Sequence, residues 1–373
     1  MKNNILFLAL FFLYPLLAGA QQKLTEKYYH RFEGNIGDNI SVTANIVRLF
    51  DKLSGNYQYR FIDEDAQMYY GKTIELEGDI SKNDSTRLRE FGQKDYTFRG
   101  HMEDKTFNGT WYGPAEKTLP FQMKEYYPNG SMKFTVSYLN SETALVKNDK
   151  NSPTANLEMI LLFPHNDYFK PYIIDSVKND IVKSFFGSGF RAGVPDSMLV
   201  HYEEEYFKNY VNQNKDWYGK GASFNWEKMI SMSVVYNSGY MLCLEYVTYG
   251  YTGGAHGMTN IAYNIIDLDK GNLLTYANVF KEDAEDSLST LLTRQLRKNY
   301  RIPDDVSLKD AGFFVDKVKP NYNIYVDGNG IGFLYNRYEI APYSQGATNI
   351  FLSWPQIKGL IKNDTPVYKM TLR

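Results

Sequence analysis

Phe98-Arg-Gly-His-Met102 and Phe107-Asn-Gly-Thr-Trp111 share one pattern, in which an apolar, a polar, a glycine, a polar and an apolar residue follow each other. The same pattern occurs at residues 32–36 and 76–80. It lies in segments where apolar and polar residues alternate, which is typical of strands with one buried face. A glycine in mid-strand weakens a flat strand, so its repetition predicts strands that bend or bulge to curl a sheet. We therefore expect a small antiparallel β barrel or sandwich in the first part of the chain.

The second part of the chain mixes strand and helix patterns. Strand patterns at 229–236, 240–249 and 259–268 follow two helical segments, and a third helix is expected at about 282–300, with Leu288, Leu291, Leu292 and Leu296 on its buried stripe. Asp327-Gly-Asn-Gly330 predicts a hairpin turn. Helices grouped around hairpins indicate an α+β fold with an antiparallel sheet and about three to four helices.

These patterns divide the chain into a leader and two domains. We expect a signal peptide at 1–20, an antiparallel β domain at 21–128 and an α+β domain at 129–373, the latter with parts at 129–236 and 237–373. The turn at Asn129-Gly130 and the polar stretch 141–152 place the boundary between residues 123 and 133. Since each part has its own apolar pattern, limited proteolysis is expected to release a stable C-terminal fragment.

The first twenty residues predict export. Lys2 is their only charge, an apolar run covers 5–17, and Ala18-Gly-Ala20 has the small residues of a cleavage site. The position where a lipoprotein carries its lipid-bearing cysteine holds Ala20, so we do not expect a lipoprotein. No later segment approaches the ~20 apolar residues of a membrane helix. The mature protein is expected in the periplasm or outside the cell, and not embedded in a membrane.

Charge and cysteine content exclude several classes of protein. The chain has 41 basic and 43 acidic residues and a net charge of −2, a balance that favours neither nucleic acid nor an anionic membrane as a partner. The single Cys243 lies in an apolar strand pattern and cannot form an intramolecular disulfide, so we expect a buried structural thiol. We expect no cofactor and no metal, and the oligomeric state is not indicated.

The densest candidate site is Tyr249-Gly-Tyr-Thr-Gly-Gly-Ala-His-Gly257, which directly follows a strand pattern. Gly253 and Gly254 can adopt positive φ, so the chain can turn sharply and hold His256 in a fixed place. A second candidate stretch lies near the C-terminus. The expected binding residues are tyrosines, glycines and two polar residues from both stretches: Tyr249, Tyr251, Gly253, Gly254, His256, Tyr338, Glu339 and Tyr343.

Three motifs together resemble the RsiV-like extracytoplasmic domain: residues 251–257, residues 267–280 and residues 332–346. The region from about 134 to 236 is similar to the companion domain that this family shares with PdaC-like peptidoglycan deacetylases. The resemblance implies an extracytoplasmic fold that binds a wall glycan or a wall-directed protein such as lysozyme, which is the ligand of the family's anti-sigma factor. The chain lacks that factor's membrane helix and sigma-binding segment, and it contains no metal-binding deacetylase region.

Two classes of function stay open. A binding protein would use the tyrosine-rich loops, since amphipathic rings suit sugar and protein surfaces. A hydrolase of cell-wall or other carbohydrate would need His256 as a base, with Glu339 as its orienting carboxylate. The chain has no serine elbow, cysteine nucleophile or multi-histidine metal spacing. We therefore favour non-catalytic binding, with His256 tying the glycine loop to the neighbouring hairpin.

Overall fold

The computed structural model describes residues 26–62, 67–91, 96–103, 105–165, 168–216 and 224–372. The expected signal peptide at 1–20 lies outside these residues. Within them, no helix is long and apolar enough to cross a membrane.

The first part of the chain is a closed antiparallel barrel, as the repeat predicts. Eight strands pair in the order β2-β1-β9-β8-β7-β6-β5-β3, and pairing of β2 with β3 closes the ring, while β4 extends β3 outside it. The strands are β1 (Lys27–Ile36), β2 (Ile40–Leu49), β3 (Lys52–Ile62), β4 (Met68–Tyr70), β5 (Ile74–Ile80), β6 (Ser85–Glu90), β7 (Thr97–Glu103), β8 (Thr106–Tyr112) and β9 (Thr118–Glu125).

The glycines of the repeat lie where neighbouring strands approach most closely. A Cβ at Gly78 would overlap the backbone of Arg87, and one at Gly34 would overlap the backbone of Gln122. Gly100 and Gly109 face each other across β7 and β8. The pairing registers run through all four positions without a shift, so the strands curl there and do not bulge. Close strand contact, which needs the absence of a side chain, explains the repeat.

The barrel interior is filled by side chains. Phe32, Phe98, Phe107 and Phe121 are at most 1% exposed and pack with Leu88 into one cluster. The alternation of buried and exposed residues along the strands supplies this core. The barrel interior is thus a packed hydrophobic core.

The second part is an α+β unit with two sheets. The larger sheet has the order β10-β11-β12-β13-β14-β15 and the smaller one β16-β17-β18. The strands are β10 (Phe134–Ala144), β11 (Thr154–Pro164), β12 (Trp226–Ser238), β13 (Met241–Tyr251), β14 (Met258–Asp267), β15 (Asn272–Leu274), β16 (Ile324–Val326), β17 (Gly330–Tyr335) and β18 (Thr348–Ser353). The pair β11–β12 is parallel, unlike the other pairs and unlike our expectation, because the crossover between them contains two helices.

The described residues contain six α-helices, two of them beyond the expected three to four. The long ones are α2 (Pro171–Phe186), α3 (Pro195–Asn214) and α5 (Glu285–Tyr300). The short ones are α4 (Tyr276–Val279), α6 (Trp354–Ile357) and α7 (Pro366–Met370), with the 3-10 turns η2 (Tyr343–Gln345) and η3 (Lys358–Leu360). A short helix opened by Pro355 is expected from the sequence and is α6. With four or five residues, α4 and α7 present too little periodicity to be recognised.

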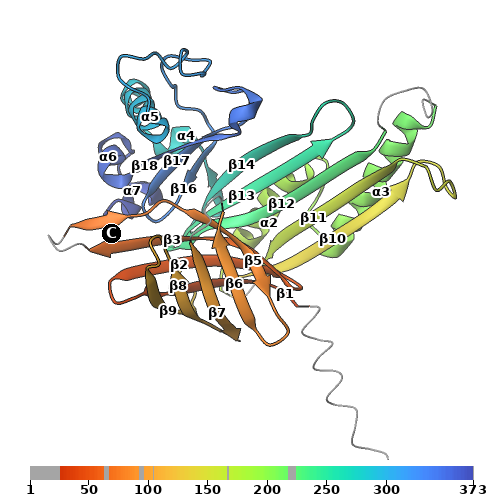
Figure 1. Cartoon of the computed structure of the whole chain (residues 1–373), viewed down its shortest axis with the longest axis horizontal. Helices are drawn as coiled ribbons and strands as arrows, with labels where there is room; N and C mark the ends of the chain where they lie inside the picture. Colours follow the sequence, from red (N-terminus) through yellow and green to blue (C-terminus); the bar gives the residue numbers. More distant parts are fainter. Residues whose placement is uncertain are drawn as a thin grey trace, which may run out of the picture.

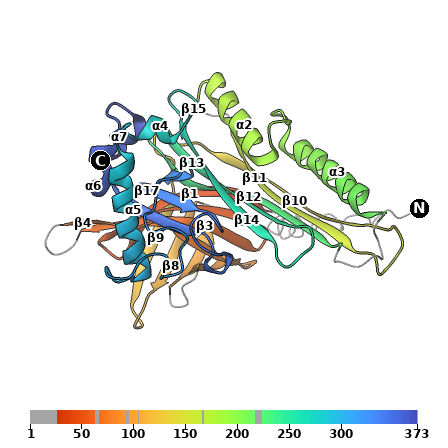
Figure 2. The same ribbon diagram turned by 90° about the horizontal axis from the view of Figure 1, so that it is seen from above.

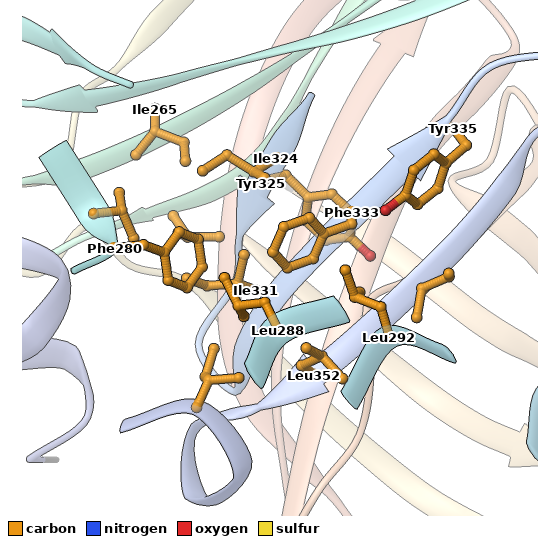
Figure 3. Packing of buried hydrophobic residues seen from close by; sticks show 14 of the residues in the cluster. Ile265, Phe280, Leu288, Leu292, Ile324, Tyr325, Ile331, Phe333, Tyr335 and Leu352 are labelled. Carbon is orange, nitrogen blue, oxygen red and sulfur yellow. The ribbon is translucent and has the colours of Figure 1, made fainter. Parts of the chain in front are cut away.

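The long helices cover different sheets. In Figure 2, α2 and α3 lie along one face of the larger sheet, while α5 lies beside β17. Of the expected stripe of α5, Leu288, Leu292 and Leu296 are buried and Leu291 is partly buried. Figure 3 shows Leu288 and Leu292 in one cluster with Phe333 of the smaller sheet. Cys243 is fully buried in the same cluster and free, as expected, and burial raises the pKa of its thiol.

The barrel lies against the larger sheet in Figure 1. A chain of buried polar side chains joins these two parts. Asn237 at the end of β12 donates to the Tyr29 hydroxyl (3.2 Å), and Tyr29 donates to Asn45 Oδ1 (2.8 Å). Asn45 donates to Asn56 Oδ1, and Asn56 donates to the carbonyl of Val234 (2.8 Å). All four side chains are at most 5% exposed. The two parts are therefore connected by directed hydrogen bonds as well as by apolar packing.

The expected hairpin turn at 327–330 exists between β16 and β17, and it also docks on the barrel. Asp327 Oδ2 accepts from the Thr73 hydroxyl (2.8 Å), and the Gly328 N–H donates to Gln58 Oε1 (2.7 Å). Asn329 Nδ2 donates to the carbonyl of Gly71. Asp327 Oδ1 accepts the N–H groups of Asn329 and Gly330, which shapes the turn.

Asp327 gives this docked turn a pH dependence. Burial raises the pKa of its carboxyl from 3.8 to about 6, and the side chain is 0% exposed. Between pH 3.8 and pH 6 the folded state binds more protons at Asp327 than the unfolded state does. The contribution of Asp327 to the free energy of unfolding therefore falls over this range and is lost as pH rises through 6. We expect wild type to lose about 1 kcal/mol more than Asp327→Asn between pH 5 and pH 7. Denaturant unfolding of both proteins at these pH values checks this.

The comparison with the variant is needed because burial also raises the pKa values of Glu245 and Glu90, whose contributions have the same sign. Equal pH dependence of wild type and Asp327→Asn would contradict the role of Asp327.

The division into 21–128 and 129–373 stays a proposal. β9 ends at Glu125 and β10 begins at Phe134, on either side of the proposed boundary. The intervening Ser131 and Met132 are buried and bound to Asn237. The expected division of the α+β domain at residue 236 falls inside β12, so the parts 129–236 and 237–373 share one sheet.

Candidate functional site

The glycine-rich loop connects β13 to β14, and its backbone turns at two glycines. Gly253 and Gly254 have φ of 100° and 97°, a region that side chains rarely adopt. The Tyr251 hydroxyl donates to the carbonyl of Gly254 (3.0 Å) and closes the turn. The Tyr249 ring lies against Gly257, where a Cβ would overlap it. The loop therefore has the fixed shape that the sequence predicts.

His256 stacks on Tyr343, which belongs to the second candidate stretch. The ring centroids are 3.9 Å apart with an interplanar angle of 24°. Both side chains also meet the carbonyl of Gly257: the Tyr343 hydroxyl donates to it (2.9 Å), and His256 Nδ1 lies 3.2 Å from it. The histidine thus joins the glycine loop to the segment after β17, as expected.

Tyr338 and Arg337 extend this stack. The Tyr338 ring lies 5.8 Å from that of Tyr343, and the Arg337 guanidinium carbon lies 4.7 Å from the Tyr343 centroid, within cation–π range. Tyr338 is 48% exposed, and His256 is also exposed. We call His256, Arg337, Tyr338 and Tyr343 the aromatic cluster. It is a solvent-facing surface built from two loops that are about eighty residues apart in sequence.

Glu339 makes its hydrogen bond to Asn321 and not to His256. Its Oε2 accepts from Asn321 Nδ2 (3.2 Å), while His256 is occupied by Tyr343 and the Gly257 carbonyl. The expected binding residues therefore separate into two groups: Tyr249, Tyr251, Gly253, Gly254, His256, Tyr338 and Tyr343 come together, whereas Glu339 binds Asn321. A histidine base oriented by Glu339 is not assembled in this arrangement.

Asn336 positions the cluster, although we did not single it out in the sequence. Its Oδ1 accepts from Ile261 N (2.8 Å) and its Nδ2 donates to Ile261 O (3.0 Å), so it holds the end of β17 against β14. Asn323 also donates to Ile261 O (2.8 Å). The position of Asn336 within the 332–346 motif was the available signal.

A partly buried carboxylate is a further feature that sequence reasoning missed. Glu245 on β13 accepts from the Tyr263 hydroxyl (2.7 Å) and from the Ser233 hydroxyl (3.2 Å), and burial raises its pKa. It lines a cavity of about 500 Å³ between the larger sheet and the barrel, together with Glu75 of β5, whose pKa burial also raises. The signal was a carboxylate inside an apolar strand. Through these hydrogen bonds, Glu245 connects β13 to Ser233 of β12 and to Tyr263 of β14 in the larger sheet.

The described part of the chain contains no group of three or more His, Cys, Asp or Glu side chains placed to hold a metal ion.

Comparison with known proteins relates this geometry to relatives. Residues 277–355, which include Arg337, Tyr338 and Tyr343, match the family described as "Protein of unknown function (DUF3298)". The peptidoglycan-N-acetylmuramic acid deacetylase PdaC of Bacillus subtilis strain 168 is 25% identical over 170 residues, 45% of this chain and 36% of that protein. The chain thus aligns with about a third of the length of this curated relative.

Two solved structures are similar to the chain. A DUF3298 family member from Bacteroides fragilis NCTC 9343 has 25% identity and a TM-score of 0.61, over 65% of this chain and 98% of that one. A DUF3298 family protein from Pseudomonas aeruginosa PAO1 has 16% identity and a TM-score of 0.44, over 62% and 95%. The chain therefore has a segment that matches the DUF3298 family model, resembles a DUF3298 structure over much of its length, and has weak sequence similarity to PdaC.

Proposed function

We propose that this protein is an exported, non-catalytic binding protein of the cell envelope. Its ligand is a wall glycan or a wall-directed protein such as lysozyme, as the resemblance to the RsiV-like domain implies. The leader at 1–20 supports release into the periplasm or the medium without a lipid anchor. The similarity to a protein named as a peptidoglycan deacetylase supports a place near the wall.

The aromatic cluster is the observation that carries the proposal. Tyr338 exposes about half of its surface, yet its neighbours are fixed by the His256–Tyr343 stack and by the bond of Tyr343 to Gly257. A rigid aromatic surface loses little conformational entropy on binding and offers ring faces to sugars or to protein side chains. Arg337 adds a cation at the edge of this surface.

The contacts of His256 support a positioning role for this residue in the aromatic cluster. A general base needs a free ring nitrogen near a substrate and a group that orients the ring. Here Nδ1 lies 3.2 Å from the carbonyl of Gly257 and Glu339 accepts from Asn321, so among the described residues no carboxylate is bound to His256 to orient its ring. The hydrolase hypothesis has no such support.

Replacing Tyr338 by alanine is expected to weaken ligand binding about tenfold, because an exposed anchor of this kind contributes more than 1 kcal/mol to an interface. The fold should be unaffected, since the ring is about half exposed. The measurement is retention of the protein chain without residues 1–20 on purified peptidoglycan and on immobilised lysozyme, with thermal unfolding of each variant in parallel.

Tyr322→Ala is the matched control, because Tyr322 is 85% exposed and lies outside the aromatic cluster. Its binding should equal that of wild type. If Tyr338→Ala bound as tightly as wild type, the aromatic cluster would not be part of the binding site. Release of soluble wall fragments by wild type, lost in His256→Ala at an unchanged melting temperature, would instead establish the hydrolase.

A further inference from the structure

A cavity of about 450 Å³ lies between the barrel and the C-terminal segment, away from the aromatic cluster. Its walls come from β2 and β3 on one side and from α6, η3 and the end of α7 on the other, which lie beside one another in Figure 1. This volume falls in the range of roughly 300–1,000 Å³ that small-molecule sites occupy. Cavities where two parts of a chain meet are common binding sites.

The charges around this cavity are mainly positive. Arg60 of β3 and Lys358 of η3 line it from opposite sides, and both side chains are exposed. Neither has an ion pair with an acid in the parts of the chain that the structure covers. The one acid of the lining, Glu33, is already bound to Arg31 (2.7 Å). Among the described residues neither of these two cations has a countercharge, which favours an anion between them.

Arg31 adds a buried group that is not fully satisfied. It is 3% exposed, and its terminal nitrogens donate to Glu33 and to the carbonyl of Tyr126 (2.7 Å). Its Nε has no hydrogen-bond partner among the described residues, although it is buried. Gln58 lines the same cavity; its Oε1 is used by Gly328, which leaves its amide nitrogen as a donor. An unmet buried donor such as Arg31 Nε is costly, and a bound acceptor would relieve it.

Two aromatic residues shape the cavity for a ring. Tyr59 is half-buried in its wall, and Trp354 lines it while its Nε1 donates to the carbonyl of Gly328 (3.0 Å). Aromatic walls pack against the apolar face of a sugar ring, while guanidinium and ammonium groups bind carboxylates.

We infer that this cavity binds a carboxylate-bearing saccharide, with Arg60 and Lys358 holding the carboxylate from the two sides. The site is separate from the aromatic cluster and goes beyond the function proposed above. Because one cation belongs to the barrel and the other to the C-terminal segment, the bound sugar would also connect the two parts of the chain.

The test is isothermal titration of the protein with glucuronate, glucose and inorganic phosphate at low ionic strength. Glucuronate is expected to bind saturably and glucose at least tenfold more weakly, because they differ by the carboxylate. Arg60→Ala and Lys358→Ala should each lower the glucuronate affinity about tenfold. Lys124→Ala, which removes an exposed charge on β9 outside the cavity, should change it less than twofold.

Three results would overturn the inference: glucuronate binding no better than glucose, unchanged affinity in both cation variants, or phosphate binding as tight as glucuronate. The last would mark a simple anion site without a role for the ring. Tyr338→Ala should bind glucuronate like wild type. The glucuronate titrations therefore test the cavity separately from the aromatic cluster, and either proposal can be rejected without the other.

Discussion

Replacing Gly78 by alanine is expected to lower the free energy of unfolding by about 3 kcal/mol or more. Gly78 lies in mid-strand in β5 opposite Leu88 of β6, and a Cβ there would overlap the carbonyl oxygen of Arg87. The clash is with backbone, so no side-chain rotation relieves it, and the paired strands must separate. Overpacking of this kind costs 1–3 kcal/mol where side chains can adjust, and more where they cannot. Denaturant unfolding followed by circular dichroism measures the loss.

Gly250→Ala is the matched control. Gly250 also lies within a strand, β13, but a Cβ there would meet no atom within 4 Å. Alanine should be neutral there or stabilise the strand by up to about 1 kcal/mol. Equal stability of Gly78→Ala and Gly250→Ala would mean that close strand contact does not explain the repeat.

Asn237→Ala is expected to destabilise the protein by about 3 kcal/mol. Asn237 Oδ1 accepts the N–H of Met132 (2.7 Å) and its Nδ2 donates to the carbonyl of Met132 (2.6 Å). Both backbone groups lie at a fully buried residue and would lose their partner, and each such loss costs about 1–3 kcal/mol. The Tyr29 hydroxyl would lose a donor as well. Chemical denaturation gives the difference from wild type.

Asn140→Ala removes an exposed amide that donates only to the Tyr138 hydroxyl, so it should change stability by less than about 0.5 kcal/mol. Far-ultraviolet and near-ultraviolet circular dichroism should report one coincident unfolding transition in wild type, because the buried polar chain couples the two parts. Two separate transitions, or a melting curve of Asn237→Ala that coincides with wild type, would contradict the coupling. The stable C-terminal fragment expected from the sequence would then be the better description.

The sequence alone determined the features that depend on local pattern. Alternation and the repeated glycines predicted a curled antiparallel sheet. Alternation reports which side of a strand is buried, and a mid-strand glycine marks a position where a neighbouring backbone comes too close for a side chain. The stripe of Leu288, Leu292 and Leu296 predicted α5, and the apolar surroundings of Cys243 predicted its burial. The glycine loop and the 332–346 motif were also identified as two halves of one candidate site.

Only the tertiary structure decided which polar groups meet. It placed His256 on Tyr343 and turned Glu339 to Asn321, and it made the turn at Asp327 a docking contact with Thr73, 254 residues away in sequence. It also brought Arg60 and Lys358 to one cavity. Periodicity reports whether a residue faces the core or solvent, but the partner of a polar side chain is set by how separately formed sheets and helices pack, since a hydrogen bond requires two groups within about 3 Å.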